Sequence, residues 1–173
     1  FHDKNNKGLI CYFEQHTRWY AVFFYIRLMK VSIITVTYYS EKYLTDCIES
    51  VIKQTYRNIE HIIIDGKSKD GTLSIIKKYN DHIAHWISET DRGMYDAINK
   101  GIELATGDIV GILNSDDMLD TEDVVEAIVE AFKDENVDAV YGDLEYVNKD
   151  DNAKIWRIWK GKPYKRSLFH FGW

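Results

Sequence analysis

Two adjacent acidic residues, Asp116 and Asp117, follow a short apolar run over residues 109–113. The run has the length and composition of a buried strand and is bounded by turn-forming residues. Adjacent carboxylates repel each other unless a cation or hydrogen-bond donors compensate their charge, and hard divalent cations prefer carboxylate oxygens. The pair therefore predicts a metal or a polar ligand at the end of this strand. For the pair alone, the alternative is a polar loop that caps a helix predicted over residues 121–132.

Polar and aromatic residues also follow three other apolar runs: Thr37-Tyr38-Tyr39, Asp65-Gly66-Lys67-Ser68 and Asp91-Arg92-Gly93. In an open α/β sheet, ligands bind beyond the carboxyl ends of the strands. A tyrosine can stack on a base, acids can accept hydrogen bonds from a base or a ribose, and a carboxylate can hold a cation. These residues predict a nucleoside-diphosphate site. The chain has neither a Gly-x-Gly-x-x-Gly nor a Gly-x-x-x-x-Gly-Lys-Ser/Thr loop, so a bound metal is expected to neutralise the diphosphate.

Strands and helices alternate along the part of the chain that carries these residues. Strands are predicted over residues 31–36, 59–64, 85–88 and 109–113, and further strands over 138–141, 144–147 and 155–159. Helices are predicted over residues 43–54, 72–79, 94–105 and 121–132. Repeated βα units of this length predict an α/β fold with a doubly wound, mostly parallel sheet and right-handed crossovers.

Composition limits the classes of function. The chain has 173 residues, 45% of them hydrophobic, which is enough for one sizeable core. With a net charge of -6, no nucleic-acid surface is indicated, and the short basic cluster Lys160, Lys162, Lys165 and Arg166 could equally touch anionic lipid. The two cysteines, Cys11 and Cys47, have no metal-site spacing, so a reducing cytoplasm is expected. His61 alternates with apolar residues, which favours an exposed or hydrogen-bonded strand position over catalysis.

The first 28 residues have no clear period, and Met29 stands directly before the first predicted strand. We therefore expect residues 1–28 to be an extension, either a mis-assigned start or residues left by cloning, and residues 29–173 to form the folded domain. The apolar run over residues 19–26 is too short to span a bilayer as a helix. An extra surface strand or a segment that rests on a membrane is the alternative for this run.

Five stretches together resemble family 2 glycosyltransferases of the GT-A fold, a Rossmann-like nucleotide-sugar-binding domain, and are most similar to the bacterial branch that builds surface polysaccharides. They are Val31-Ser-Ile-Ile-Thr-Val-Thr-Tyr38, Glu49-Ser-Val-Ile-Lys-Gln-Thr55, Ile62-Ile-Ile-Asp-Gly-Lys-Ser-Lys-Asp-Gly-Thr72, Ser88-Glu-Thr-Asp-Arg-Gly-Met-Tyr-Asp-Ala-Ile-Asn-Lys-Gly101 and Ala105-Thr-Gly-Asp-Ile-Val-Gly-Ile-Leu-Asn-Ser-Asp-Asp117. The resemblance implies inverting transfer of a sugar from a nucleotide-sugar, usually a UDP-sugar, with Mg or Mn. It also implies a saccharide or lipid-linked acceptor and a place in the cytoplasm, including the inner face of the cell membrane, with peripheral membrane association.

The resemblance also assigns roles to individual residues. It implies that Val36 and Tyr38 border the base, and that Asp65 contacts the base and the ribose. Asp116 and Asp117 would form the metal-binding motif, the first nearer the ribose and the second nearer the metal. From its place after the third strand, Asp91 joins the predicted nucleotide-sugar site.

The chain departs from the family at four positions. Val36 stands where many members have Pro, Tyr39 where Asn is usual, Gly66 where some members have a second base-contacting Asp, and Asn114 where others have the first acid of an Asp-x-Asp. Tyr39 is therefore either a site residue or an aromatic residue of the core or rim. Asp70 is favoured as the N-cap of the helix over residues 72–79 rather than as a ligand group.

The family's catalytic base is an Asp or Glu of the acceptor half. None of the acids after Asp117, among them Asp143, Glu145, Asp150 and Asp151, matches the family's base motif, so the base is expected beyond Trp173 and the acceptor half is expected to be truncated. Two alternatives stay open: a nucleotide-sugar-binding half-domain without turnover, and a sugar nucleotidyltransferase. The second would need a Gly- and Arg-rich loop after the first strand, where the chain has Thr37-Tyr-Tyr-Ser-Glu41.

Overall fold

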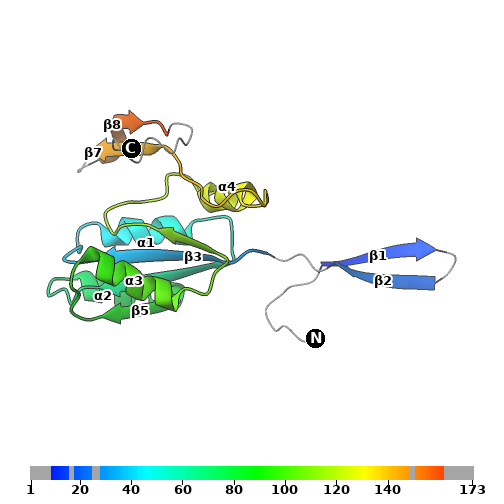
Figure 1. Ribbon diagram of the computed structural model, residues 1–173, viewed down its shortest axis with the longest axis horizontal. Coiled ribbons are helices and arrows are strands. Elements are labelled where there is room, and N and C mark those ends of the chain that lie inside the picture. The colour runs from blue at the N-terminus through cyan, green and yellow to red at the C-terminus, as the bar shows by residue number, and fades with distance from the viewer. Residues whose placement is uncertain (1–8, 16–17, 25–27, 149–150, 162–173) are drawn as a thin grey trace. The chain divides into compact units, whose positions relative to one another are not determined.

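A four-stranded parallel sheet positions the predicted site residues (Figure 1). The computed structural model describes residues 9–15, 18–24, 28–148 and 151–161. The strand order is β5-β4-β3-β6, with β3 at Val31–Thr37, β4 at Ile59–Asp65, β5 at His85–Ser88 and β6 at Ile109–Ile112. All neighbouring pairs are parallel, so the carboxyl ends of these strands meet at one edge. The predicted α/β fold with a parallel sheet is confirmed.

Helices cover both faces of this sheet. The helices are α1 at Leu44–Ile52, α2 at Thr72–Lys78, α3 at Met94–Leu104 and α4 at Val124–Ala131, with a short 3₁₀ helix at Asn80–His82. On one face, Ile34 of β3 and Ile62 of β4 pack against Ile98 of α3. On the other face, Ile63 of β4 packs against Ile48 of α1 and Ile76 of α2. Successive strand residues point to opposite faces, and the two strands that are buried on both faces, β3 and β4, are accordingly apolar at most of their positions.

The helix predicted over residues 121–132 begins later, at Val124. A side chain far away in the sequence contacts this start. Gln54, 1% exposed, accepts a hydrogen bond from the Val125 amide at 3.0 Å and donates one to the Thr121 carbonyl at 2.7 Å. Its side chain therefore satisfies backbone groups in the first turn of α4 and in the turn before it.

Two further predictions differ from the structure. The strand predicted over residues 138–141 is wrong, because this run pairs with no strand among the described residues. In this part of the chain, β7 at Leu144–Asn148 pairs with β8 at Asp151–Trp159 in an antiparallel hairpin. Strand β8 begins earlier than predicted. A second antiparallel hairpin, β1 at Leu9–Gln15 with β2 at Arg18–Phe24, occupies the segment where no period was found.

The chain divides into two units, Phe1–Val129 and Glu130–Trp173, and the parallel sheet belongs to the first. The basic residues Lys162, Lys165 and Arg166, and Asp150, lie outside the described residues. In the described part of the chain, no helix combines the length and the apolar character that a membrane span needs.

A buried carboxylate ties the amino ends of the strands together. Glu60 of β4, 4% exposed, accepts hydrogen bonds from Ser32 Oγ at 2.5 Å and Thr106 Oγ1 at 2.7 Å, and pairs with Lys30. Burial alone would raise the pKa of Glu60, but these donors outweigh it and lower the pKa to about 2. The ionised form is thus the one that the fold stabilises.

Glu60→Gln is expected to lower the free energy of unfolding at pH 7 by about 2–3 kcal/mol, because the folded-state pKa lies below the unfolded value of 4.5. A depressed carboxylate pKa gives stability that is fully present above the unfolded pKa and is lost as the pH falls toward about 2. Urea unfolding at pH 7, 5 and 3 should show the gap between wild type and variant closing with acid. Glu103→Gln, an exposed acid on α3, is the control, and a gap that is constant across this range would contradict the assignment.

Candidate functional site

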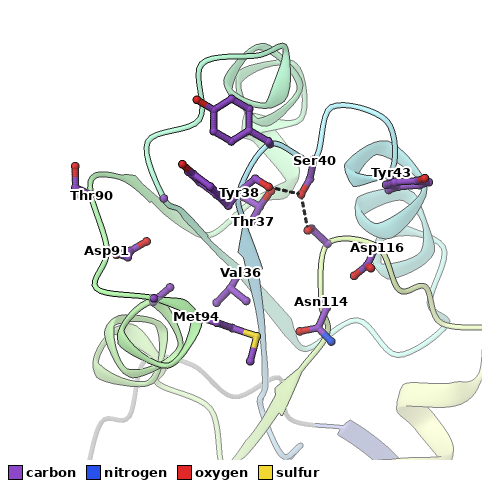
Figure 2. A pocket seen from close by; sticks show the side chains of 15 residues that line it. Val36, Thr37, Tyr38, Ser40, Tyr43, Thr90, Asp91, Met94, Asn114 and Asp116 are labelled. Atoms are coloured by element: carbon purple, nitrogen blue, oxygen red, sulfur yellow. Dashed lines mark hydrogen bonds between the residues drawn. The ribbon is translucent and has the colours of Figure 1, made fainter.

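A cavity of about 810 Å³ opens at the carboxyl ends of the strands (Figure 2). The end of β3 and the loop that follows it supply the most residues to its lining, and the loop after β6 and the start of α3 close its sides. The lining includes Val36, Thr37, Tyr38, Tyr39, Ser40, Gly66, Asp91, Asn114, Ser115 and Asp116. Four of the residues predicted to bind a nucleotide-sugar, Val36, Tyr38, Asp91 and Asp116, thus lie around one cavity.

Tyr38 presents a largely exposed ring, 65% accessible, at this cavity. The ring lies close to Gly66, since a Cβ added to that glycine would be 3.0 Å from Tyr38 Cδ2 and 3.3 Å from Asp91 Oδ2. A side chain at position 66 would displace the ring and meet the Asp91 carboxylate. The glycine that departs from the family pattern therefore lets Tyr38 and Asp91 approach each other across the cavity.

The loop after β3 holds Tyr39 in the left-handed backbone region, with φ 54°. Lys67, on the facing loop, has φ 64°. Non-glycine residues are uncommon there and each costs on the order of 1–3 kcal/mol. Ser68 connects the two loops, because its Oγ accepts a hydrogen bond from the Tyr39 amide at 2.8 Å. The Tyr39 ring meets Tyr38 edge-on with 4.6 Å between ring centroids, so it is an aromatic residue of the pocket rim.

Asp65 ends β4 and is fully buried, and it is not among the residues that line the cavity. Its carboxylate accepts hydrogen bonds from the Ser68 amide at 3.1 Å and from the Ser68 and Ser88 hydroxyls, each at 2.5 Å. The carboxylate predicted to contact the base and the ribose is thus bonded to the loop that follows β4 and to the last residue of β5.

Lys100 of α3, for which the sequence pattern predicted no role, holds the loop that carries Asp91. Its ammonium pairs with Asp91 and lies 2.8 Å from Glu89 Oε1. The hydrogen bond to Asp91 is the main cause that raises the pKa of Lys100. The sequence did contain one signal for an ion pair of Lys100: Asp96 and Lys100 are four residues apart, which places them on one face of the helix.

Asp116 and Asp117 are exposed in the turn that follows β6. Asp117 does not line the cavity, and its Oδ2 accepts a hydrogen bond from Asn114 Nδ2 at 2.9 Å. The described residues hold no group of three or more His, Cys, Asp or Glu side chains that would form a complete metal site. Two carboxylates fit Mg or Mn nonetheless, because Mg²⁺ at nucleotide sites is bound through one or two carboxylates plus phosphate oxygens and water.

Two buried titratable residues on the α1 face of the sheet are structural. Burial raises the pKa of the Cys47 thiol to about 12 and lowers the pKa of His61 to about 4, so both are neutral at pH 7. His61 Nε2 is 2.9 Å from Thr35 Oγ1, and Cys47 donates to the Asn114 carbonyl at 3.4 Å. The N-cap predicted at Asp70 is wrong by one residue, because the N-cap of α2 is Gly71; Asp70 accepts a hydrogen bond from the Thr72 amide at 3.1 Å in the turn before the helix.

Comparison with known sequences gives one family. The family model described as glycosyl transferase family 2 matches residues 32–172. An uncharacterized glycosyltransferase of Mycobacterium tuberculosis, Rv1514c, is 42% identical over 102 residues, which is 58% of this chain and 39% of the relative. Glycosyltransferase GlyG of Streptococcus pneumoniae is 31% identical over 125 residues, covering 70% and 40%. A PGL/p-HBAD biosynthesis glycosyltransferase of Mycobacterium bovis is 37% identical over 118 residues, covering 65% and 46%.

Solved structures agree in fold. Staphylococcus aureus TarS 1–349 in complex with UDP-GlcNAc has a TM-score of 0.55 and 31% identity, with 62% of this chain and 32% of that chain covered. Mannosyltransferase PcManGT from Pyrobaculum calidifontis, in complex with GDP-Man and Mn²⁺, has a TM-score of 0.56 and 25% identity, with 70% and 36% covered. The chain spans 39–46% of the length of the three curated relatives named above.

Proposed function

This chain belongs to glycosyl transferase family 2. We propose that its cavity binds the nucleotide of a nucleotide-sugar donor and that this donor is a UDP-sugar. The protein then transfers the sugar with inversion to a saccharide or lipid-linked acceptor of cell-surface polysaccharide synthesis. The observation that carries the proposal is the cavity of about 810 Å³ in which an exposed aromatic ring, a carboxylate and the first of two adjacent acids face one another. This combination suits a base, a ribose and a charged diphosphate.

In this proposal Tyr38 stacks on the base and Val36 borders it at the floor of the cavity. The exposed ring and its approach to Gly66 support the stacking role, because a flat base needs an open aromatic face. Asp91 accepts a hydrogen bond from the base or the ribose, while Lys100 keeps the Asp91 loop in place. These contacts orient the donor before any chemistry takes place.

Asp117 and Asp116 would hold Mg or Mn beside the diphosphate. When bound, such a cation supplies Lewis-acid stabilisation of the negative charge that builds on the leaving diphosphate. Asn114 orients the Asp117 carboxylate through its amide, and Asp116 extends the same acidic surface into the cavity. The Mn²⁺ named with PcManGT and GDP-Man supports a divalent cation in this proposal.

The acceptor and the cellular place are proposed from the relatives. The M. bovis relative is named for PGL/p-HBAD biosynthesis, and the TarS structure contains UDP-GlcNAc. We therefore propose a UDP-sugar donor and a glycolipid or polysaccharide acceptor for this protein. Peripheral association with the cytoplasmic face of the membrane would bring a lipid-linked acceptor to the site.

Tyr38→Ala is expected to weaken UDP binding about 10-fold, because base–aromatic stacking contributes roughly 1–3 kcal/mol. Isothermal titration calorimetry with UDP in Mn²⁺ measures the change. Tyr38→Phe keeps the ring and should bind like the wild type, while Tyr146→Ala, an exposed tyrosine of β7, controls for a general aromatic effect. Wild-type affinity in Tyr38→Ala would remove the stacking role, and no binding of UDP or GDP by the wild type would remove the proposed function.

A further inference from the structure

We propose that a buried pair of hydroxyl groups, Ser40 and Ser115, couples the loop that carries Tyr38 to the loop that carries Asp116 and Asp117. Their Oγ atoms are 2.7 Å apart, and Figure 2 draws this bond as the dashed line that runs from Ser40 toward the loop of Asn114 and Asp116. Ser115 is then a positioning residue through which metal binding and nucleotide binding strengthen each other. This inference rests on the proposed function and adds an interaction that connects two parts of the same site.

Ser40 begins the turn that leads into α1. Its carbonyl accepts hydrogen bonds from the Tyr43 and Leu44 amides, both at 3.0 Å, and the N-cap residue of α1 itself is Tyr43. A serine at the start of a helical turn can bond a nearby amide through its hydroxyl. No side-chain cap is present at α1, and the Ser40 hydroxyl instead reaches Ser115, 75 residues away in the sequence.

Both ends of this bond are firmly held. The Ser40 amide donates to Thr72 Oγ1 at 2.9 Å, which fixes Ser40 to the first residue of α2. Ser115 lies between Asn114 and Asp116, and the Cys47 thiol donates to the Asn114 carbonyl at 3.4 Å. The acidic loop is therefore attached to α1 through Cys47 and to the Tyr38 loop through Ser115.

The hydrogen bond between Ser40 and Ser115 is buried, which strengthens its effect on the two loops. Ser40 is 9% exposed and Ser115 is 7% exposed, so water competes little for their hydroxyls. Removing the Ser40 hydroxyl takes this bond from Ser115, whereas removing the Ser115 hydroxyl leaves Ser40 only its longer bond, 3.5 Å, to the Tyr38 carbonyl. Losing a buried hydrogen bond is unfavourable in either case. The acidic loop would then keep its connection to α1 but lose its direct connection to the loop that presents Tyr38.

The consequence is thermodynamic coupling between two ligands. A cation bound by Asp116 and Asp117 orders the acidic loop, and the hydroxyl pair transmits that order to the loop at the base end of the cavity. Coupling between two binding sites is reciprocal, and typical values change affinity about 5- to 150-fold. Here the measurable quantity is the metal factor, defined as the Kd for UDP in EDTA divided by the Kd for UDP in Mn²⁺.

Calorimetry on the full 173-residue chain tests the proposal with UDP, and with GDP if UDP does not bind. Ser115→Ala and Ser40→Ala should each lower the metal factor about 5-fold, chiefly by weakening binding in Mn²⁺ and not in EDTA. The double variant should be no worse than either single variant, because all three lack the same bond. Ser115→Thr retains the hydroxyl and should keep the wild-type metal factor, and Ser74→Ala, on the exposed side of α2, is the matched control.

The outcomes separate this inference from the proposed function. If the wild type binds neither nucleotide, the proposed function fails and the coupling fails with it. If the wild type shows a metal factor well above one and Ser115→Ala keeps it, the coupling alone is overturned. Additive losses in the double variant would also overturn it. If the alanine variants do not fold, Ser115→Cys takes their place, because a thiol is a weak donor of nearly the same shape. It should lower the metal factor in the same direction, and an unchanged metal factor in Ser115→Cys would overturn the coupling.

Discussion

Asp117→Ala is expected to lower the affinity for UDP in Mn²⁺ about 100-fold and to make the affinities in Mn²⁺ and EDTA nearly equal. The carboxylate is exposed, stands next to a second acid and is oriented by the Asn114 amide. A hard cation prefers charged oxygen, and the diphosphate is poorly neutralised without the cation. Asp116→Asn keeps an oxygen ligand and should lose only about 10-fold. Calorimetry of UDP binding by the wild type and both variants measures the difference.

The control for this prediction is Asp120→Ala, because Asp120 is an exposed acid three residues further along the same loop. It should leave both affinities unchanged, which would show that the loss does not follow from net charge alone. Equal affinity of the wild type in Mn²⁺ and EDTA would contradict the metal role of Asp117. A larger loss in Asp116→Asn than in Asp117→Ala would exchange the roles of the two acids.

The sheet could be predicted from local sequence because its two central strands, β3 and β4, are buried and each of its four strands carries an apolar run. Each of β3, β4, β5 and β6 begins and ends within one residue of an apolar run found in the sequence. Such a run must pair and pack to exclude water, whatever lies elsewhere in the chain. The start of α4 could not be predicted in this way, because its contacts involve Gln54, a residue that lies 70 positions before Val124.

Residues 138–141 show the limit of the same rule. An apolar run forms a strand only where a neighbouring strand can form backbone hydrogen bonds with it. The fold topology, and not the composition of the run, decides which segments become neighbours. Among the described residues, β7 pairs with β8 and leaves this run outside the ladder. The hairpin of β1 with β2 shows the converse, since two strands form there without a clear hydrophobic period.

The outline of the site also followed from topology. The carboxyl ends of parallel strands meet at one edge, so Tyr38, Asp91 and Asp116 could be placed around a common cavity from their positions in the sequence. The contacts that hold these residues could not be predicted, because Lys100 reaches a loop from α3 and Ser115 connects two loops that are far apart in the sequence. Such contacts depend on side-chain directions that a one-dimensional pattern does not contain.

The hydrogen bonds of Asp65 to Ser68 and Ser88 follow from its position in the strand and in the sheet. His61, Ile63 and Asp65 alternate along β4 and so share one face of the sheet. In the parallel register Asp65 stands opposite Thr37 on one side and Ser88 on the other. The serine three residues after Asp65 is also within reach of a local turn that an aspartate commonly makes. These relations favour a bonded carboxylate over one that is open to a ligand.

Asp65→Ala is expected to lower the free energy of unfolding by about 3–5 kcal/mol, because it removes a fully buried carboxylate that accepts three part-buried hydrogen bonds from Ser68 and Ser88. Urea unfolding followed by tryptophan fluorescence measures this change. Asp81→Ala, an exposed acid in the 3₁₀ helix, is the control and should change stability by less than about 0.5 kcal/mol.

The same substitution separates the two roles considered for this carboxylate. If Asp65 contacts the base and the ribose directly, Asp65→Ala should weaken UDP binding while stability stays near that of the wild type. If it organises the loops, stability falls and Ser68→Ala reproduces part of both losses, since Ser68 links Asp65 to the Tyr39 amide. Because Tyr39 is held with φ 54° through that link, its release should relax the loop after β3 and lower UDP affinity without any direct contact being lost. Unchanged stability of Asp65→Ala would exclude the organising role.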